Sequence, residues 1–128
     1  MTNRQLCSGL LLVLGFLLGL SPVLAHHSPS EQDRTRVVTL MGTVTKWALI
    51  NPHGLLSFDV VDEQGNVEQW TGTGGAPNHM RRVGWTAQTL RPGDKVTVIG
   101  HPYKDGRKLL YFTSVILPDG SKIGSVQD

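Results

Sequence analysis

The chain has little of what many functional classes require. Its 128 residues include one cysteine, so neither an internal disulfide nor a multi-cysteine zinc site can form. Charged residues make up only 17% and the formal net charge is +2, which lacks the basic excess of nucleic-acid-binding domains. Aromatic residues are scarce at 6%, whereas there are 15 glycines and 7 prolines. This balance predicts one turn-rich β domain rather than a helical bundle.

Recognisable catalytic motifs are also missing. The sequence has no G-x-S-x-G nucleophile elbow, no H-E-x-x-H zinc motif and no phosphate-binding P-loop. The adjacent carboxylates Asp62 and Glu63 fall in a predicted hairpin loop, where they favour solubility. We therefore expect a binding protein rather than an enzyme.

Residues 1–25 have the pattern of a secretory signal peptide. Arg4 gives a positive start, residues 9–20 form an apolar run, and Ala25 ends a small-residue cleavage site. We predict cleavage between Ala25 and His26, with the bacterial periplasm as the simplest destination. The apolar run is short for a transmembrane helix, and an uncleaved N-terminal anchor is the competing interpretation.

The exported chain is predicted to have three parts. Cleavage would remove the only cysteine, Cys7, and leave all five histidines. Residues 26–36 are polar and without periodicity, which indicates a flexible N-terminal arm. Residues 37–118 would form the folded domain, and residues 119–128 a loose C-terminal tail.

Alternating apolar and polar positions predict five strands with one short helix between the third and the fourth. The strands are expected at 37–49, 55–61, 67–73, 95–102 and 108–117, and the helix at 77–83. Gly42 in the long first strand indicates a bulge or sharp bend. This order predicts an all-β fold with one short helix, a small five-stranded OB-like Greek-key barrel. A small β-sandwich is the alternative, but closing a barrel hides more strand edges.

Several short segments carry a resemblance to a known family. They are AHHS (25–28), GTVT (42–45), NPH (51–53), PN (77–78), RRVGWT (81–86), LRPGD (90–94), KDG (104–106) and LPDG (117–120). With the signal peptide, they resemble a family of small exported bacterial proteins, domain-of-unknown-function family 6152. The resemblance implies a periplasmic β domain and no particular activity. The family often has an acidic residue where this chain has Thr73, so no role for that carboxylate carries over.

The histidines are the main candidates for chemistry. After the predicted cleavage, His26 would offer its α-amine and a ring nitrogen to one metal ion, with His27 beside it. A second imidazole would complete a three-nitrogen site suited to Cu(II). His53, in a turn between Pro52 and Gly54, is the first candidate for that imidazole.

Two further histidines and a second cleavage position are also considered. His79 and His101 are additional candidate ligands, and His79 precedes Met80 in a pair that could suit Cu(I). Cleavage before Ala25 would instead place a histidine at position three, a pattern that binds Cu(II) or Ni(II) in a square plane. Both forms need neutral imidazoles, so binding should weaken at low pH.

Each of these residues also has a purely structural interpretation. Histidines in an arm often bind nothing specific, His53 could hydrogen-bond to the backbone of its turn, and Met80 could face the core. Trp47, Trp70 and Trp85 could line a ligand face of the barrel, or could simply pack in the core.

Two functions remain after these arguments. The first is a periplasmic metal-binding protein, with copper as the expected cofactor. The alternative is a module that binds a small molecule, a peptide or a cell-envelope protein on the tryptophan face. A nucleic-acid partner is not expected, because the chain has no basic groove.

Overall fold

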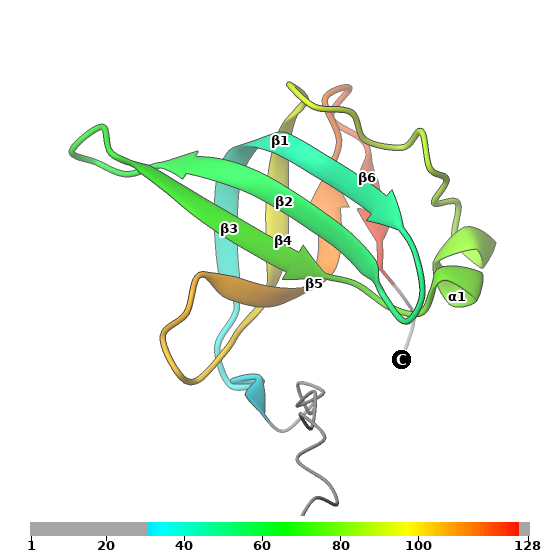
Figure 1. The fold of residues 1–128 in the computed structure, drawn as a ribbon, viewed down its shortest axis with the longest axis horizontal. Coiled ribbons are helices and arrows are strands. Elements are labelled where there is room, and N and C mark those ends of the chain that lie inside the picture. The colour runs from blue at the N-terminus through cyan, green and yellow to red at the C-terminus, as the bar shows by residue number, and fades with distance from the viewer. Residues whose placement is uncertain (1–30, 126–128) are drawn as a thin grey trace, which may run out of the picture.

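The computed structural model describes residues 31–125, which form a closed β-barrel with one short helix (Figure 1). In chain order the elements are β1 (Val38–Leu49), β2 (Gly54–Val61), β3 (Val67–Thr73), α1 (Pro77–Arg82), β4 (Lys95–Pro102), β5 (Leu109–Ile116) and β6 (Lys122–Gly124). In this range no helix has the length and apolar character needed to cross a membrane.

The strand order is that of a small OB-like barrel. Neighbouring strands follow the order β3-β2-β1-β4-β5-β6, and all of these pairs are antiparallel. A parallel pairing of β3 with β5, from Thr71↔Leu109 to Thr73↔Tyr111, closes the barrel. Closure leaves few unpaired backbone groups, which is why a five-strand domain favours it over an open sheet. The predicted fold class is confirmed.

Strand β1 pairs with β2 along one half and with β4 along the other. Its register against β2 shifts between Val44 and Lys46, so the strand bends there. The sequence predicted this bend at Gly42, but there the structure requires glycine for another reason, the close approach of β2. A Cβ atom on Gly42 would lie 2.7 Å from the carbonyl oxygen of Asp59 on β2, so only glycine permits this close approach.

The core follows the inward positions of the strands. On β4, Val96 and Val98 are buried and alternate with partly exposed residues, as expected for a half-buried strand. The largest side chains that are fully buried are Trp85, Phe58, Phe112, Leu56 and Met80. Aromatic and long aliphatic groups of this size supply most of the hydrophobic stabilisation in a domain this small.

Helix α1 matches its predicted position. Pro77 stands in its first turn, where a missing backbone N–H costs nothing, and Gly84 follows its end with φ of +108°. Met80 points inward and is fully buried. The structural interpretation of Met80 as a core residue is therefore the one that the fold supports.

The C-terminal segment differs from the predicted loose tail. Residues 122–124 form β6, which pairs with β5 through Val115↔Ile123. The buried indole of Trp85 donates its Nε1–H to the carbonyl oxygen of Gly124 at 2.7 Å. A buried indole N–H needs an acceptor, and this strand supplies it. A strand of three residues is too short to show the alternation of apolar and polar positions from which a strand is predicted.

The described part of the N-terminal arm also differs from a flexible segment. Gln32 forms a β-bridge with Tyr103. The backbone N–H of Asp33 donates to the carbonyl oxygen of Pro102 at 2.8 Å, and that of Lys104 donates to Glu31 at 2.9 Å. Residues 31–36 therefore run along the end of β4. The signal peptide and residues 26–30 lie outside the described residues.

Candidate functional site

The candidate residues divide between two regions, which we call the α1 end and the hairpin end. The α1 end comprises the β1–β2 turn (50–53), α1 and Trp85. The hairpin end comprises the β4–β5 turn (103–108) and the arm segment 31–36. In Figure 1, α1 and the β4–β5 turn lie on different sides of the barrel. Strand β1 starts near the hairpin end and finishes at the α1 end.

His53 is exposed in the β1–β2 turn, which is held against the start of the helix segment. The backbone N–H of Gly54 donates to Gly75 at 3.0 Å, and that of Gly74 donates to Gly54 at 2.8 Å. A Cβ atom on Gly54 would lie 2.6 Å from Met80 Sδ, so the turn sits directly on the helix. The turn can therefore present His53 outward from a fixed backbone.

His79 is also exposed and belongs to the same end. Its backbone N–H bonds to Ala76 and to the side-chain oxygen of Asn78, and its ring extends from the surface of α1. His53 and His79 thus stand on two adjoining segments. Within residues 31–125, however, no three histidine, cysteine or acidic side chains are grouped closely enough to hold a metal ion.

His101 lies at the hairpin end, on β4. Its Nδ1 is 2.7 Å from the carbonyl oxygen of Arg36. A carbonyl oxygen can only accept a hydrogen bond, so Nδ1 must carry the proton. In the neutral ring the lone pair then resides on Nε2. This contact also fixes the ring against the arm.

Charged side chains surround the hairpin end. Arg107 Nη2 lies 3.6 Å from a carboxylate oxygen of Glu31, and its guanidinium lies 5.8 Å from the centre of the Tyr103 ring. Asp33 accepts hydrogen bonds from the hydroxyl and the backbone N–H of Thr35, and the side-chain bond is the main cause that lowers the pKa of Asp33. These contacts hold the arm in place from Glu31 onward.

The tryptophans do not form one ligand face. Trp85 is only 1% exposed. The ring centroids of Trp47 and Trp85 lie 4.8 Å apart, and both rings contact Phe112. Trp47 is half-buried and donates its Nε1–H to the carbonyl oxygen of Thr86 at 2.9 Å. Trp47 and Trp85 are therefore packing residues at the α1 end.

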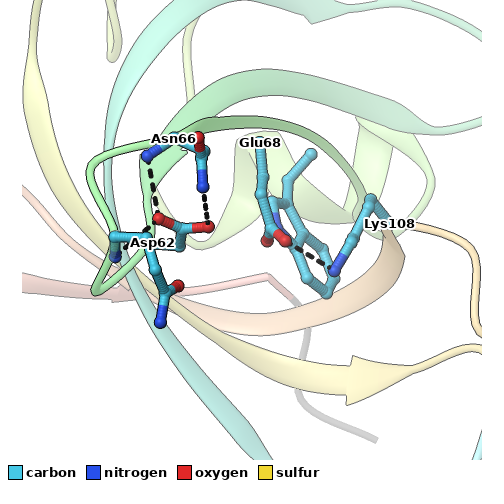
Figure 2. A network of polar contacts seen from close by, with 6 residues as sticks. Asp62, Asn66, Glu68 and Lys108 are labelled. Atoms are coloured by element: carbon cyan, nitrogen blue, oxygen red, sulfur yellow. Dashed lines mark hydrogen bonds and ion pairs between the residues drawn. The ribbon is translucent and has the colours of Figure 1, made fainter.

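Trp70 belongs to a separate cluster that joins β3 to β5. Its Nε1–H donates to Glu68 at 3.1 Å, and Lys108 donates to the other oxygen of Glu68 at 2.9 Å, as Figure 2 shows for the Glu68–Lys108 pair. The Lys108 ammonium also lies 5.3 Å from the centre of the Trp70 ring. The hydrogen bond from Lys108 is the largest cause that lowers the pKa of Glu68.

The cluster of Glu68, Trp70 and Lys108 was missed by sequence reasoning. Lys108 and Glu68 are far apart in the chain and meet because β3 and β5 pair in parallel. A single sequence carries no signal for that pairing.

Asp62 lies in the predicted hairpin loop, but its carboxylate makes hydrogen bonds within the turn instead of only favouring solubility. Its carboxylate accepts from the backbone N–H groups of Gln64 at 2.9 Å and Asn66 at 2.8 Å, and from the Asn66 side chain at 3.0 Å (Figure 2). The bonds from Asn66 are the main causes that lower the pKa of Asp62. Gly65 in this loop has φ of +85°. Asp62 therefore stabilises the β2–β3 turn.

Comparisons with known proteins give a family and no activity. No curated protein matches the chain. Among solved structures, it is similar to part of a crystal structure of TiaS in complex with a transfer RNA and ATP, at 24% identity and a TM-score of 0.43. That match covers 66% of this chain and only 18% of the other. A family model described as "Family of unknown function (DUF6152)" matches residues 17–110, and the chain belongs to this family.

Proposed function

We propose that this protein is an exported periplasmic domain that binds one Cu(II) ion at the amino terminus created by cleavage before His26. The α-amine and one ring nitrogen of His26 would form a chelate, and further nitrogen donors would complete a planar site. Copper(II) prefers nitrogen ligands in this arrangement and heads the affinity order of the divalent metals.

The observation that supports this proposal is the anchoring of the arm at Glu31. The backbone N–H of Lys104 donates to the carbonyl oxygen of Glu31, and the next residue of the arm, Gln32, forms a β-bridge with Tyr103. His26 precedes Glu31 by five residues, so its distance from this fixed point is at most about 17 Å. A short tether to a rigid barrel lowers the entropy cost of recruiting a ligand from the barrel.

The experiment is a Cu(II) titration of the chain that starts at His26, in competition with a chelator of known affinity. We expect one equivalent to bind. A matched chain whose α-amine is acetylated should lose tight binding, because the blocked amine can no longer take part in the chelate. Unchanged affinity in both the acetylated chain and His26→Ala would overturn the proposal.

Two further variations characterise the site. If cleavage occurs before Ala25, the chain starting there should bind in a square plane and depend on His27 rather than on His26. In either form the affinity should fall as pH drops through the imidazole range, about 6.5, because protons compete with the metal.

A metal-independent binding module is the second candidate, and the exposure of Trp70 favours it. This ring is half-buried and stands beside one cation, Lys108, and one anion, Glu68. Such a surface suits a small molecule, a peptide or an envelope protein with a planar or charged group. The candidate predicts a ligand-dependent change in tryptophan fluorescence that chelators leave unchanged and Trp70→Phe removes.

A further inference from the structure

We propose that two copies of this chain associate through the first half of β1, so that one β-sheet continues across two barrels. This half, residues 38–42, pairs with β4 on one side. On its other side, β2 pairs with β1 only from Thr43 onward. Figure 1 shows the β2–β3 hairpin diverging from β1 and projecting beyond it. The first half of β1 is therefore an open strand edge, and the proposal does not depend on the copper site.

The backbone groups along this edge lack partners. In an antiparallel pair, successive residues direct their N–H and C=O groups alternately toward the neighbouring strand and away from it. Val44 is bonded on the β4 side, where it donates to Asp94 and accepts from Gly93. Counting back along β1, the even-numbered residues face β4, whereas Thr39 and Met41 direct their backbone groups away from it. Within residues 31–125, no strand or loop pairs with those groups.

Exposed apolar side chains gather at the same place. Met41 is 75% exposed, and Val37, just before the strand, is exposed as well. Val61 and Val67 lie opposite each other at the end of the β2–β3 hairpin, and both are exposed. Four of the six large hydrophobic residues that are exposed in the described part of the chain thus lie along this edge or on the hairpin beside it. Apolar residues that gather in this way indicate a contact surface.

The composition of the edge fits a second copy as the partner. An open edge accepts another extended strand, and proteins usually prevent this with charged residues, prolines or bulges. Residues 37–45 (VVTLMGTVT) include no charged residue and no proline, and the register of β1 shifts only after Val44. An uncharged edge does not repel its own copy, and it offers no charge that would select a different partner.

The edge is also self-complementary. When two copies pair antiparallel about a two-fold axis at Leu40, Thr39 lies opposite Met41 of the second copy, and Met41 lies opposite its Thr39. Both residues direct their bonding groups outward, so each of these pairs exchanges two backbone hydrogen bonds. Leu40, which is half-buried, then faces Leu40 of the second copy and gains apolar contact. Burial of Met41 from both copies adds a hydrophobic contribution.

The test is sedimentation equilibrium of the chain purified from the exported fraction, at several concentrations and with a chelator present so that no metal joins two copies. We expect a concentration-dependent dimer. Met41→Lys should raise its dissociation constant at least about tenfold, because each dimer loses two buried methionine side chains and gains two charges. Ile50→Lys is the matched control and should dimerise like the unmodified chain, because Ile50 is 55% exposed at the α1 end.

Hydrogen exchange of backbone amides locates the contact without any substitution. In the unmodified chain, the amides of Thr39 and Met41 should exchange rapidly at low concentration and slowly at high concentration. Amides of β4 should be equally protected in Met41→Lys, which verifies that this variant folds, because the N–H of Met41 does not bond to β4. The proposal is wrong if the chain stays monomeric at every concentration, if Met41→Lys dimerises as tightly as Ile50→Lys, or if the concentration-dependent protection appears on β3 instead of β1.

Discussion

The α1 end and the hairpin end of the barrel are built from different interactions. At the α1 end, Trp85 and Met80 are fully buried, and the Trp85 ring contacts that of Phe112. At the hairpin end, Arg107 and Lys108 form partly exposed ion pairs with glutamates of the arm and of β3. Exposed ion pairs contribute little to stability, whereas buried aromatic side chains contribute much. The α1 end therefore contributes more to the stability of the fold than the hairpin end does.

The largest difference in stability is expected between two tryptophan variants. One removes Trp85 from the α1 end, and the other removes Trp70, which lies beside Lys108 of the hairpin end. Trp85→Ala leaves a large cavity and orphans the carbonyl oxygen of Gly124, so we expect a loss of about 3–5 kcal/mol in the free energy of unfolding. Trp70→Ala removes a half-buried ring and should cost clearly less. Denaturant unfolding measures both. Equal losses would contradict the division between the two ends.

A smaller effect is expected from glycines that differ in their surroundings. On β4, a Cβ atom on Gly100 would overlap the carbonyl oxygen of Tyr111 on β5, so Gly100→Ala must push two strands apart. We expect a loss of about 2–3 kcal/mol in the free energy of unfolding, in the upper part of the range for overpacking, because the overlap is with backbone. Gly65→Ala is the matched control, because nothing lies within 4 Å and only its φ of +85° opposes alanine. Its cost should be about 1 kcal/mol. A Gly100→Ala variant as stable as Gly65→Ala would contradict the close approach of β4 and β5.

The smallest effect concerns the contribution of Glu68 to stability in acid. The pKa of Glu68 is lowered in the folded state, first by Lys108 and then by Trp70. A lowered folded pKa means that the unfolded chain binds more protons, so stability is present above the ordinary value of 4.5 and is lost as pH falls through the folded pKa. Glu68→Gln should flatten the pH dependence of unfolding below 4.5.

The matched variant for that effect is Lys108→Met, which keeps the length of the side chain. It should bring the pKa of Glu68 back toward its ordinary value in a carboxyl titration followed by nuclear magnetic resonance. A pKa that stays equally low in Lys108→Met would show that the ion pair is not its main cause.

The strands and the helix could be predicted from sequence because their signals are local. Alternation identifies β4, and Pro77 and Gly84 mark the limits of α1. The parallel pairing of β3 with β5 could not be predicted in detail, because it depends on contacts across the whole chain. The order of helix and strands allowed only the class of barrel to be inferred.

The candidate site was predictable in residue type but not in arrangement. The sequence favoured His53 because its turn suggested an exposed side chain, and the turn is indeed exposed. What it could not show is that residues 31–36 run beside β4, which places Arg36 against His101. The same holds for Trp85, whose indole N–H finds its acceptor on β6.

The most direct test of the account is native mass spectrometry of the protein purified from the exported fraction, with one equivalent of Cu(II) added. We predict a chain that begins at His26, or at Ala25, and carries one copper ion. A chain that retains its leader, begins at another residue or remains without copper would contradict the central claim.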